Sequence, residues 1–282
     1  PRSFNCYLLI SFIFIAVLLL LPTKAYAYET LILDDLKDVP DDLSFDFTYE
    51  NAEFEFNGVD GIVRRENIAG YDLYWVSVPT PSGKQNGGFS YSDFLNITFP
   101  NIGSIGDKLI NINIHIDNLE VTTSGPGKLN NRTYFLAFST NDIPRMEFKS
   151  CVSKQFYVDY TVSITYSDTG ELVSLPFFQK VYDLDLGTSN DYFNEGWMPL
   201  NGFDTLYFYK DSALVNDNGF FNTPDGYSYV YEDELFKSGI VASAPIGQLS
   251  GRFEEGNCGS TIMVYSQFTN IKDPIKTAII TS

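Results

Sequence analysis

The chain has 282 residues, of which 36 are Asp or Glu and 18 are Lys or Arg, so its formal net charge at pH 7 is −18. Nucleic-acid binding depends on basic side chains that neutralise phosphates, so this charge predicts that nucleic acid is not a partner. A single histidine and three cysteines argue against zinc sites that use several His or Cys ligands. The acidity is compatible with Ca²⁺ binding, and equally with charge that only keeps the protein soluble.

The N-terminus has the three-part layout of a secretory signal peptide. Arg2 precedes an unbroken apolar run at residues 7–22, and the small-residue triplet 25–27 follows it. A membrane anchor needs about 20 apolar residues, which is more than this run provides. We expect residues 1–27 to be a cleaved signal peptide. The mature protein would then be secreted or extracellular, associated with the cell surface, and not an integral membrane protein.

An acidic leader is predicted at residues 28–42, where an Asp-rich run surrounds Pro40. From Leu43 onward the chain breaks into short runs that alternate between apolar and polar residues, which is typical of β-strands. Strands are predicted within the segments 43–56, 71–78, 95–99, 133–139, 205–209, 227–232 and 260–268.

The clearest strand is the segment LININIHID, at residues 109–117. Ile110, Ile112, Ile114 and Ile116 alternate with Asn111, Asn113, His115 and Asp117. Successive side chains of a strand point to opposite faces, so the four Ile should enter a core and the polar set should face solvent.

A second pattern predicts a hairpin. Val158, Tyr160, Val162, Ile164 and Tyr166 share one strand face, and the turn SDTGE follows at residues 167–171. Such a turn between two β-rich runs indicates that a neighbouring strand returns.

About ten to fourteen strands with no helical periodicity predict an all-β fold, namely one large antiparallel β-sandwich or jelly roll. We assign this domain to residues 43–270. Residues 271–282 are interpreted as a linker towards further modules of the same polypeptide.

Two stretches resemble N-terminal β-sandwich modules of large Gram-positive bacterial cell-surface proteins of the adhesin type. The first stretch is LNITFPNIGSIGDKLININIHI, which matches the modules at Asn101, Gly103, Gly106 and Lys108 but departs from them at Ile105 and Asn111. The second includes the DTGE turn and the strand end at Asp183 and Asp185. The resemblance implies an extracellular adhesin-like or scaffold role, but no particular ligand. A glycan or an extracellular protein is the ligand class that we consider.

No catalytic residues are predicted. His115, the only histidine, is interpreted as a surface residue, because a triad needs a Ser and an orienting carboxylate within hydrogen-bond reach and the sequence has no Gly-x-Ser-x-Gly motif. The alternative is a carbohydrate-active hydrolase that uses paired carboxylates.

A Ca²⁺ site is considered at Asp183, Asp185, Asp191 and Glu195, since an oxygen-rich loop follows a strand that carries two carboxylates on one face. An Asp- and Asn-rich turn without a metal would have the same composition. A Ca²⁺-stabilised structural spacer therefore stays open as a variant of the scaffold role.

A ligand-binding tyrosine stripe is considered at Tyr227, Tyr229 and Tyr231, with Trp75 as a further exposed aromatic. Burial of the same rings in a core is the alternative.

The sequence also leaves two covalent cross-links undecided, a disulfide and an isopeptide bond. Cys151 and Cys258 remain after signal cleavage and could form one disulfide or stay as two thiols. Lys180 has apolar neighbours, as a lysine in an intramolecular isopeptide bond would.

Overall fold

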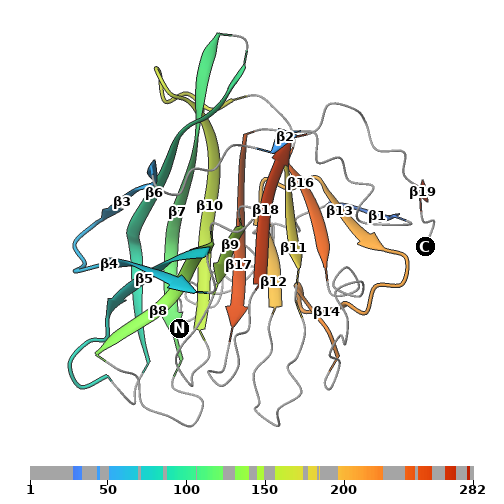
Figure 1. Ribbon diagram of the computed structural model, residues 1–282. Coiled ribbons are helices and arrows are strands. Elements are labelled where there is room, and N and C mark those ends of the chain that lie inside the picture. The colour runs from blue at the N-terminus through green and yellow to red at the C-terminus, as the bar shows by residue number, and fades with distance from the viewer. Residues whose placement is uncertain are drawn as a thin grey trace, which may run out of the picture.

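The computed structural model describes residues 28–33, 43–44, 51–68, 71–84, 88–105, 107–122, 131–139, 145–148, 156–173, 177–182, 184, 196–224, 239–244, 247–255, 264–270 and 278–279. These residues form two large β-sheets, one of 11 strands and one of eight (Figure 1). The predicted all-β sandwich is confirmed.

The 11-stranded sheet has the order β19-β1-β13-β16-β11-β18-β9-β8-β5-β4, and β2 pairs with β18. Its strands are β1 (Glu29–Leu33), β2 (Leu43–Ser44), β4 (Ile62–Ile68), β5 (Tyr71–Pro79), β8 (Arg132–Ser139), β9 (Arg145–Phe148), β11 (Phe177–Tyr182), β13 (Thr205–Tyr209), β16 (Ile240–Ala244), β18 (Val264–Asn270) and β19 (Ala278–Ile279). Neighbouring strands are antiparallel except β1 and β13, which pair in parallel.

The eight-stranded sheet is antiparallel throughout, in the order β14-β15-β12-β17-β10-β7-β6-β3. Its strands are β3 (Glu53–Phe56), β6 (Phe89–Ile105), β7 (Lys108–Val121), β10 (Phe156–Tyr166), β12 (Gly196–Asn201), β14 (Val215–Asp217), β15 (Phe220–Asn222) and β17 (Gln248–Glu255). β6, β7 and β10 are the longest described strands and rise side by side in Figure 1.

The core lies between the two sheets and confirms the alternation that the sequence indicates. Ile110, Ile112, Ile114 and Ile116 of β7 are all buried, with at most 3% of each residue exposed. Aromatic rings join the sheets: Phe94 of β6 contacts Phe135 of β8, and two further edge contacts meet Phe138 of β8. The apolar side of each strand therefore provides the contact between the two layers.

A buried polar group also connects the layers. The Tyr160 hydroxyl of β10 donates to Gln179 Oε1 of β11 at 2.9 Å and accepts from the Trp197 indole N–H of β12 at 2.8 Å. Burial raises the pKa of Tyr160, so the hydroxyl keeps its proton. The Tyr160 hydroxyl lies close to the backbone of β17 at Gly251. This position requires glycine, because a Cβ there would lie 2.5 Å from the Tyr160 oxygen.

The predicted hairpin at residues 158–182 is only partly correct. The turn forms, with Gly170 at φ +70° and a hydrogen bond from the Gly170 N–H to the Tyr166 carbonyl. The returning chain makes a single bridge, from Leu172 to Thr165, and the next strand, β11, belongs to the other sheet. β11 instead pairs with β16 and β18 in the opposite layer, where its Val181 is buried in the core.

Two short strands fall in segments that the sequence analysis assigned elsewhere. β1 lies in the predicted acidic leader and pairs with β13, and β19 lies in the predicted linker and pairs with β1.

Candidate functional site

The outer side of the eight-stranded sheet carries polar side chains, and we call this side the polar face. Its residues are Asp93, Asn96, Thr98, Asn113, His115, Asp117, Asp159, Thr161, Thr165, Ser250 and Arg252. Where β6, β7 and β10 lie side by side, the Thr98 hydroxyl donates to Asn113 Oδ1 at 3.1 Å, and Asn113 Nδ2 donates to the Thr165 hydroxyl at 2.9 Å. These residues alternate with the buried Ile residues of β7, so the same strand that fills the core also builds this face.

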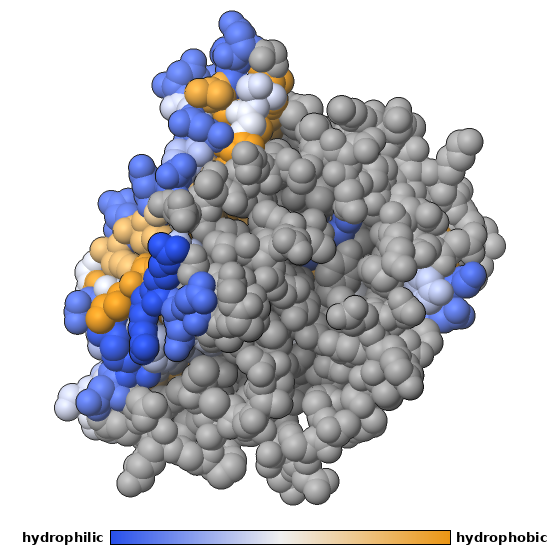
Figure 2. All heavy atoms as spheres, viewed as in Figure 1, coloured by the Kyte–Doolittle hydropathy of each residue, from blue (hydrophilic) through white to orange (hydrophobic). Residues whose placement is uncertain are grey.

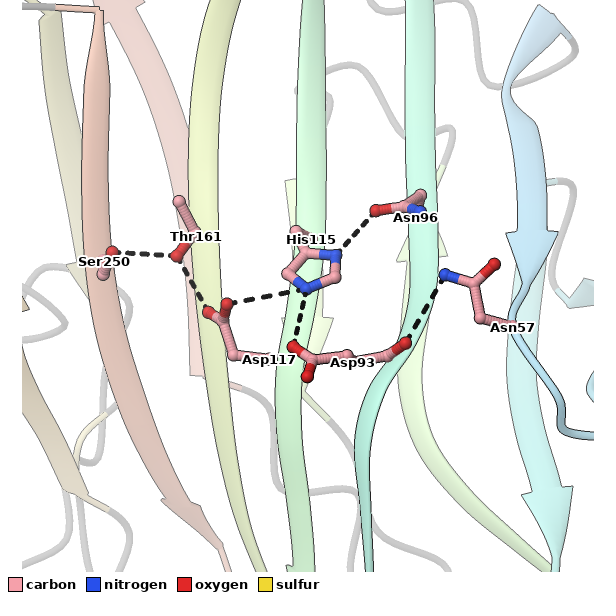
Figure 3. A network of polar contacts seen from close by, with 7 residues as sticks. All are labelled: Asn57, Asp93, Asn96, His115, Asp117, Thr161 and Ser250. Carbon is pink, nitrogen blue, oxygen red and sulfur yellow. Dashed lines mark hydrogen bonds and ion pairs between the residues drawn. The ribbon is translucent and has the colours of Figure 1, made fainter.

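On the polar face, the His115 ring lies next to Asn96, Asp93 and Asp117 (Figure 3). It is directly opposite Asn96 of β6 and Thr161 of β10 in the strand register. Its Nδ1 lies 2.6 Å from Asn96 Oδ1. Its Nε2 lies 3.3 Å from Asp93 Oδ1 and 3.6 Å from Asp117 Oδ1. We call Asp93, His115 and Asp117 the His115 cluster.

Irregular strand pairing places the two carboxylates beside the imidazole. The register between β6 and β7 shifts between Ser92 and Leu95, and Asp93 adopts φ +49°, a left-handed conformation that Asp tolerates better than most residues. The backbone here is tied to the end of β3 by a hydrogen bond from the Asn57 N–H to the Phe94 carbonyl at 2.9 Å. Such bulges redirect side chains, and this one directs Asp93 towards His115.

Asp117 occupies a second irregularity, where β7 and β10 shift register between Asp159 and Tyr160. Its Oδ2 accepts a hydrogen bond from the Thr161 hydroxyl at 2.8 Å, and Thr161 in turn contacts Ser250 of β17 at 2.8 Å. Burial raises the pKa of the Asp117 carboxyl, although Thr161 and His115 act in the opposite direction. The carboxylate is therefore held in place in a position where its charge is poorly solvated.

Further along the polar face, Arg252 of β17 makes a two-pronged ion pair with Asp159 of β10, in which the Nη2–Oδ2 distance is 2.7 Å. The guanidinium also lies over the ring of Tyr157 at 5.8 Å. Tyr157 donates to Glu254 Oε1 at 3.3 Å, and burial raises the pKa of the Glu254 carboxyl. This half of the face is thus stabilised by its own internal pairs.

The hairpin end of β6 and β7 forms a second surface. Leu109 and Leu172 are exposed there, at 50% and 47%, and the Lys108 ammonium lies 4.8 Å from the centre of the Tyr166 ring. A hollow of about 430 Å³ is lined by Asp107, Lys108, Leu109, Ser167 and Asp168. The projecting part at the top of Figure 2 mixes hydrophobic and hydrophilic residues in this way.

Trp75 does not offer an exposed ring, which corrects its assignment as a ligand-binding residue. It is 8% exposed and packs edge-on against Tyr134, with Ala137 as a further buried neighbour. The sequence placed it correctly on a strand, β5, but its side of the sheet is covered.

The other predicted site residues lie outside the described residues. These are the tyrosine stripe (Tyr227, Tyr229, Tyr231), the Ca²⁺ ligands (Asp183, Asp185, Asp191, Glu195) and the cysteines (Cys151, Cys258). Lys180 is described and is buried in β11, at 3% exposure.

Sequence reasoning missed the His115 cluster. The spacing of His115 and Asp117, two residues apart on one strand, was a readable sign that both share a face. Asp93 gave no such sign, because its position depends on the bulge between β6 and β7.

Within the described part of the chain, no helix has the length and hydrophobicity needed to cross a bilayer.

Comparison with known proteins identifies a fold and no sequence family. No family model matches the chain, and no curated protein matches it. Among solved structures, the chain is similar to the N-terminal domain of the Streptococcus gordonii adhesin Sgo0707, with a TM-score of 0.69 and 13% identity over 88% of this chain and 67% of that one. The two therefore share a fold, and the similar structure is the N-terminal domain of an adhesin.

Weaker matches are two structures of the PrgB adhesin domain from Enterococcus faecalis, both 14% identical. The structure bound to DNA covers 70% of each chain with a TM-score of 0.41, and the other covers 70% of this chain and 67% of that one with a TM-score of 0.39.

The PrgB complex corrects the expectation that nucleic acid is not a partner. An adhesin domain that this chain matches was solved bound to DNA, which contradicts that expectation. Net charge is a sum over the whole molecule, whereas contact with phosphates depends on the local distribution of basic side chains. What PrgB binds remains a property of PrgB.

Proposed function

We propose that this chain is a non-catalytic, adhesin-type module of a bacterial cell surface, which binds a glycan or an extracellular protein. The observation that carries the proposal is the fold shared with the Sgo0707 adhesin domain over 88% of the chain. The predicted signal peptide at residues 1–27 supports export, which a surface module requires.

The polar face supports a ligand rich in hydrogen-bonding groups. Its hydroxyl and amide side chains, such as Thr98, Asn113 and Thr165, lie on rigid neighbouring strands, and both donors and acceptors are present. Rigid elements hold such groups at little entropic cost on binding, which favours recognition of sugars or polar peptide surfaces.

The experiment is a binding screen of the purified protein against glycans and extracellular-matrix proteins, run in Ca²⁺ and again in chelator. DNA is included because its exclusion no longer holds. Saturable binding to a glycan or protein is expected, without turnover of any glycan. Binding to no glycan and no protein, with or without binding to DNA, would overturn the proposal, and so would release of new reducing ends from a glycan.

Two pairs of substitutions locate the ligand. The Tyr227→Ala and Tyr229→Ala pair tests the predicted tyrosine stripe, and the Leu109→Ala and Leu172→Ala pair at the hairpin end is the matched control of two exposed apolar residues. Loss of binding in the first pair alone would assign the ligand to the stripe. Binding that is lost in chelator and restored by Ca²⁺ but not by Zn²⁺ would support the predicted Ca²⁺ ligands near Asp183.

We propose no hydrolase function. That alternative depended on acids such as Asp183 and Asp185, and these lie outside the described residues, so no described geometry favours it.

A further inference from the structure

Three groups that can ligate a metal converge at the His115 cluster. One ligand atom each from Asp93, His115 and Asp117 can be chosen so that all three lie within 4.8 Å of one another. The His115 Nε2 atom lies between the carboxylates, 3.3 Å from Asp93 Oδ1 and 3.6 Å from Asp117 Oδ1. The three residues come from two adjacent strands, β6 and β7, so the sheet itself fixes their positions.

The hydrogen bond to Asn96 sets the role of each imidazole nitrogen. Nδ1 lies 2.6 Å from Asn96 Oδ1, and an amide oxygen only accepts, so Nδ1 carries a hydrogen and donates it. In the neutral ring, Nε2 then presents a lone pair to two carboxylate oxygens, which are also acceptors. Three acceptors that face one another repel unless a cation lies between them.

Two cations would resolve this conflict, a proton on Nε2 or a bound metal ion. The distances from Nε2 fit a metal ion, and the two carboxylate oxygens lie within 4.8 Å of each other. Zinc bonds to nitrogen and oxygen ligands are about 2.0–2.2 Å long, which places the ligand atoms of a tetrahedral site about 3.3–3.6 Å apart. Both measured distances from Nε2 fall in that range.

We propose that Asp93, His115 and Asp117 form a three-ligand site for a divalent transition metal ion of the Zn²⁺ type. The imidazole favours such an ion over Ca²⁺, which takes six to eight oxygen ligands. The cluster is open to solvent, since the side chains of Asp93, His115 and Asp117 are 82%, 31% and 38% exposed. Water, or a donor group of a bound ligand, would complete the coordination.

The residues around the cluster match what metal ligands need. Asn96 fixes the tautomer and orientation of His115, and Thr161 holds Asp117 through its second oxygen. This site is distinct from the predicted Ca²⁺ ligands near Asp183, and the inference does not depend on the proposed adhesin function.

The test uses the only histidine of the chain as a reporter. The purified protein, without a polyhistidine tag, is labelled with ¹⁵N histidine and titrated with Zn²⁺ while NMR follows both ring nitrogens. We expect Nε2 to shift to a metal-bound value at one equivalent, with Nδ1 still protonated. Zinc that binds elsewhere, for instance at Cys151 or Cys258, leaves these signals unchanged.

Substitutions test the carboxylates. Asp93→Asn and Asp117→Asn should each weaken the zinc response of His115 at least 10-fold. Asp168→Asn makes the same charge change at an exposed turn position and should leave the response as it is. An Nε2 signal that saturating Zn²⁺ does not move would overturn the proposal in favour of a protonated imidazole. An equal loss of the zinc response in all three variants would also overturn the proposal, because the loss would then follow from the change in net charge rather than from the removal of a ligand.

Discussion

The two faces of β7 share one backbone and differ completely in what their side chains do. On one face, four Ile residues are buried in the core between the sheets. On the other, Asn111, Asn113, His115 and Asp117 face outward and form hydrogen bonds to β6, to β10 and to Ser167 in the turn after β10. One strand can therefore fill a core with alternate residues and present hydrogen-bonding side chains with the residues between them.

The largest expected effect is on the core face. Ile114→Ala removes a side chain from a position that is 1% exposed, and we expect the free energy of unfolding to fall by about 2–5 kcal/mol through lost burial and a residual cavity. Ile114→Val, a milder change, should cost about 0.5–1.5 kcal/mol. Urea denaturation measures both.

The matched control is the neighbouring residue on the other face. Asn113→Ala removes two hydrogen bonds at a half-buried position, and we expect a cost of about 1 kcal/mol. A cost equal to that of Ile114→Ala would contradict the division between the two faces.

The same substitution on the two faces of β10 sharpens the comparison. Tyr160→Phe removes a fully buried hydroxyl that accepts a hydrogen bond from the Trp197 N–H. We expect the free energy of unfolding to fall by about 1–3 kcal/mol, because a buried donor that loses its acceptor is destabilising. Tyr157→Phe removes an outer-face hydroxyl at 3.3 Å from Glu254 and should cost less than about 1 kcal/mol. Equal urea midpoints for the two variants would argue against a structural role for the inner hydroxyl.

A smaller effect is expected at the ion pair of the polar face. Arg252→Gln removes the two-pronged contact with Asp159, whose side chain is 14% exposed, and should cost about 1 kcal/mol at low salt. Because the guanidinium is 32% exposed, this contribution should shrink in 1 M salt. The unfolding temperatures of the variant and the wild type, measured at both ionic strengths, would show this. A difference that salt leaves unchanged would indicate packing rather than charge.

The smallest expected effect is a pH dependence from Glu254. Burial raises the pKa of this carboxyl above its ordinary value of 4.5, so the folded state binds the proton more tightly than the unfolded chain does. The resulting stabilisation is present below about pH 4.5 and is lost as the pH rises through the raised folded value.

The urea midpoint of the wild type should therefore fall between about pH 4 and pH 7, by less than about 1 kcal/mol in the free energy of unfolding. Glu254→Gln should remove this fall. Glu171→Gln, at an exposed turn, is the control. A midpoint that declines equally in the wild type and Glu254→Gln would assign the pH dependence to other groups.

Much of the fold was predictable wherever one face of a strand is buried. The Ile alternation of β7 and the Val and Tyr alternation of β10 gave both the strands and the buried side, because a period of two leaves only one choice of face. Strand pairing was not predictable. β10 pairs with β17, some 90 residues away, and no local pattern encodes such a partner.

The candidate site was predictable only in part, for the same reason. The sequence placed His115 and Asp117 on the outer face, since that follows from alternation. It could not place Asp93, which reaches His115 only because the β6–β7 register shifts between Ser92 and Leu95. The prediction that the Trp75 ring is exposed was wrong for a different reason. Its burial depends on the residues that pack against β5, and the sequence of β5 alone does not specify them.

Thermal unfolding with and without Zn²⁺, measured for the wild type, Ile114→Val and His115→Gln, tests the division between the two faces most directly. Because a ligand of the folded state raises its stability by mass action, zinc should raise the wild-type midpoint. Ile114→Val should lower the midpoint and keep the zinc-induced rise, whereas His115→Gln should keep the midpoint within a few degrees and lose the rise. If both variants lose both properties, or if neither responds differently from the wild type, the two faces of β7 do not have separate roles.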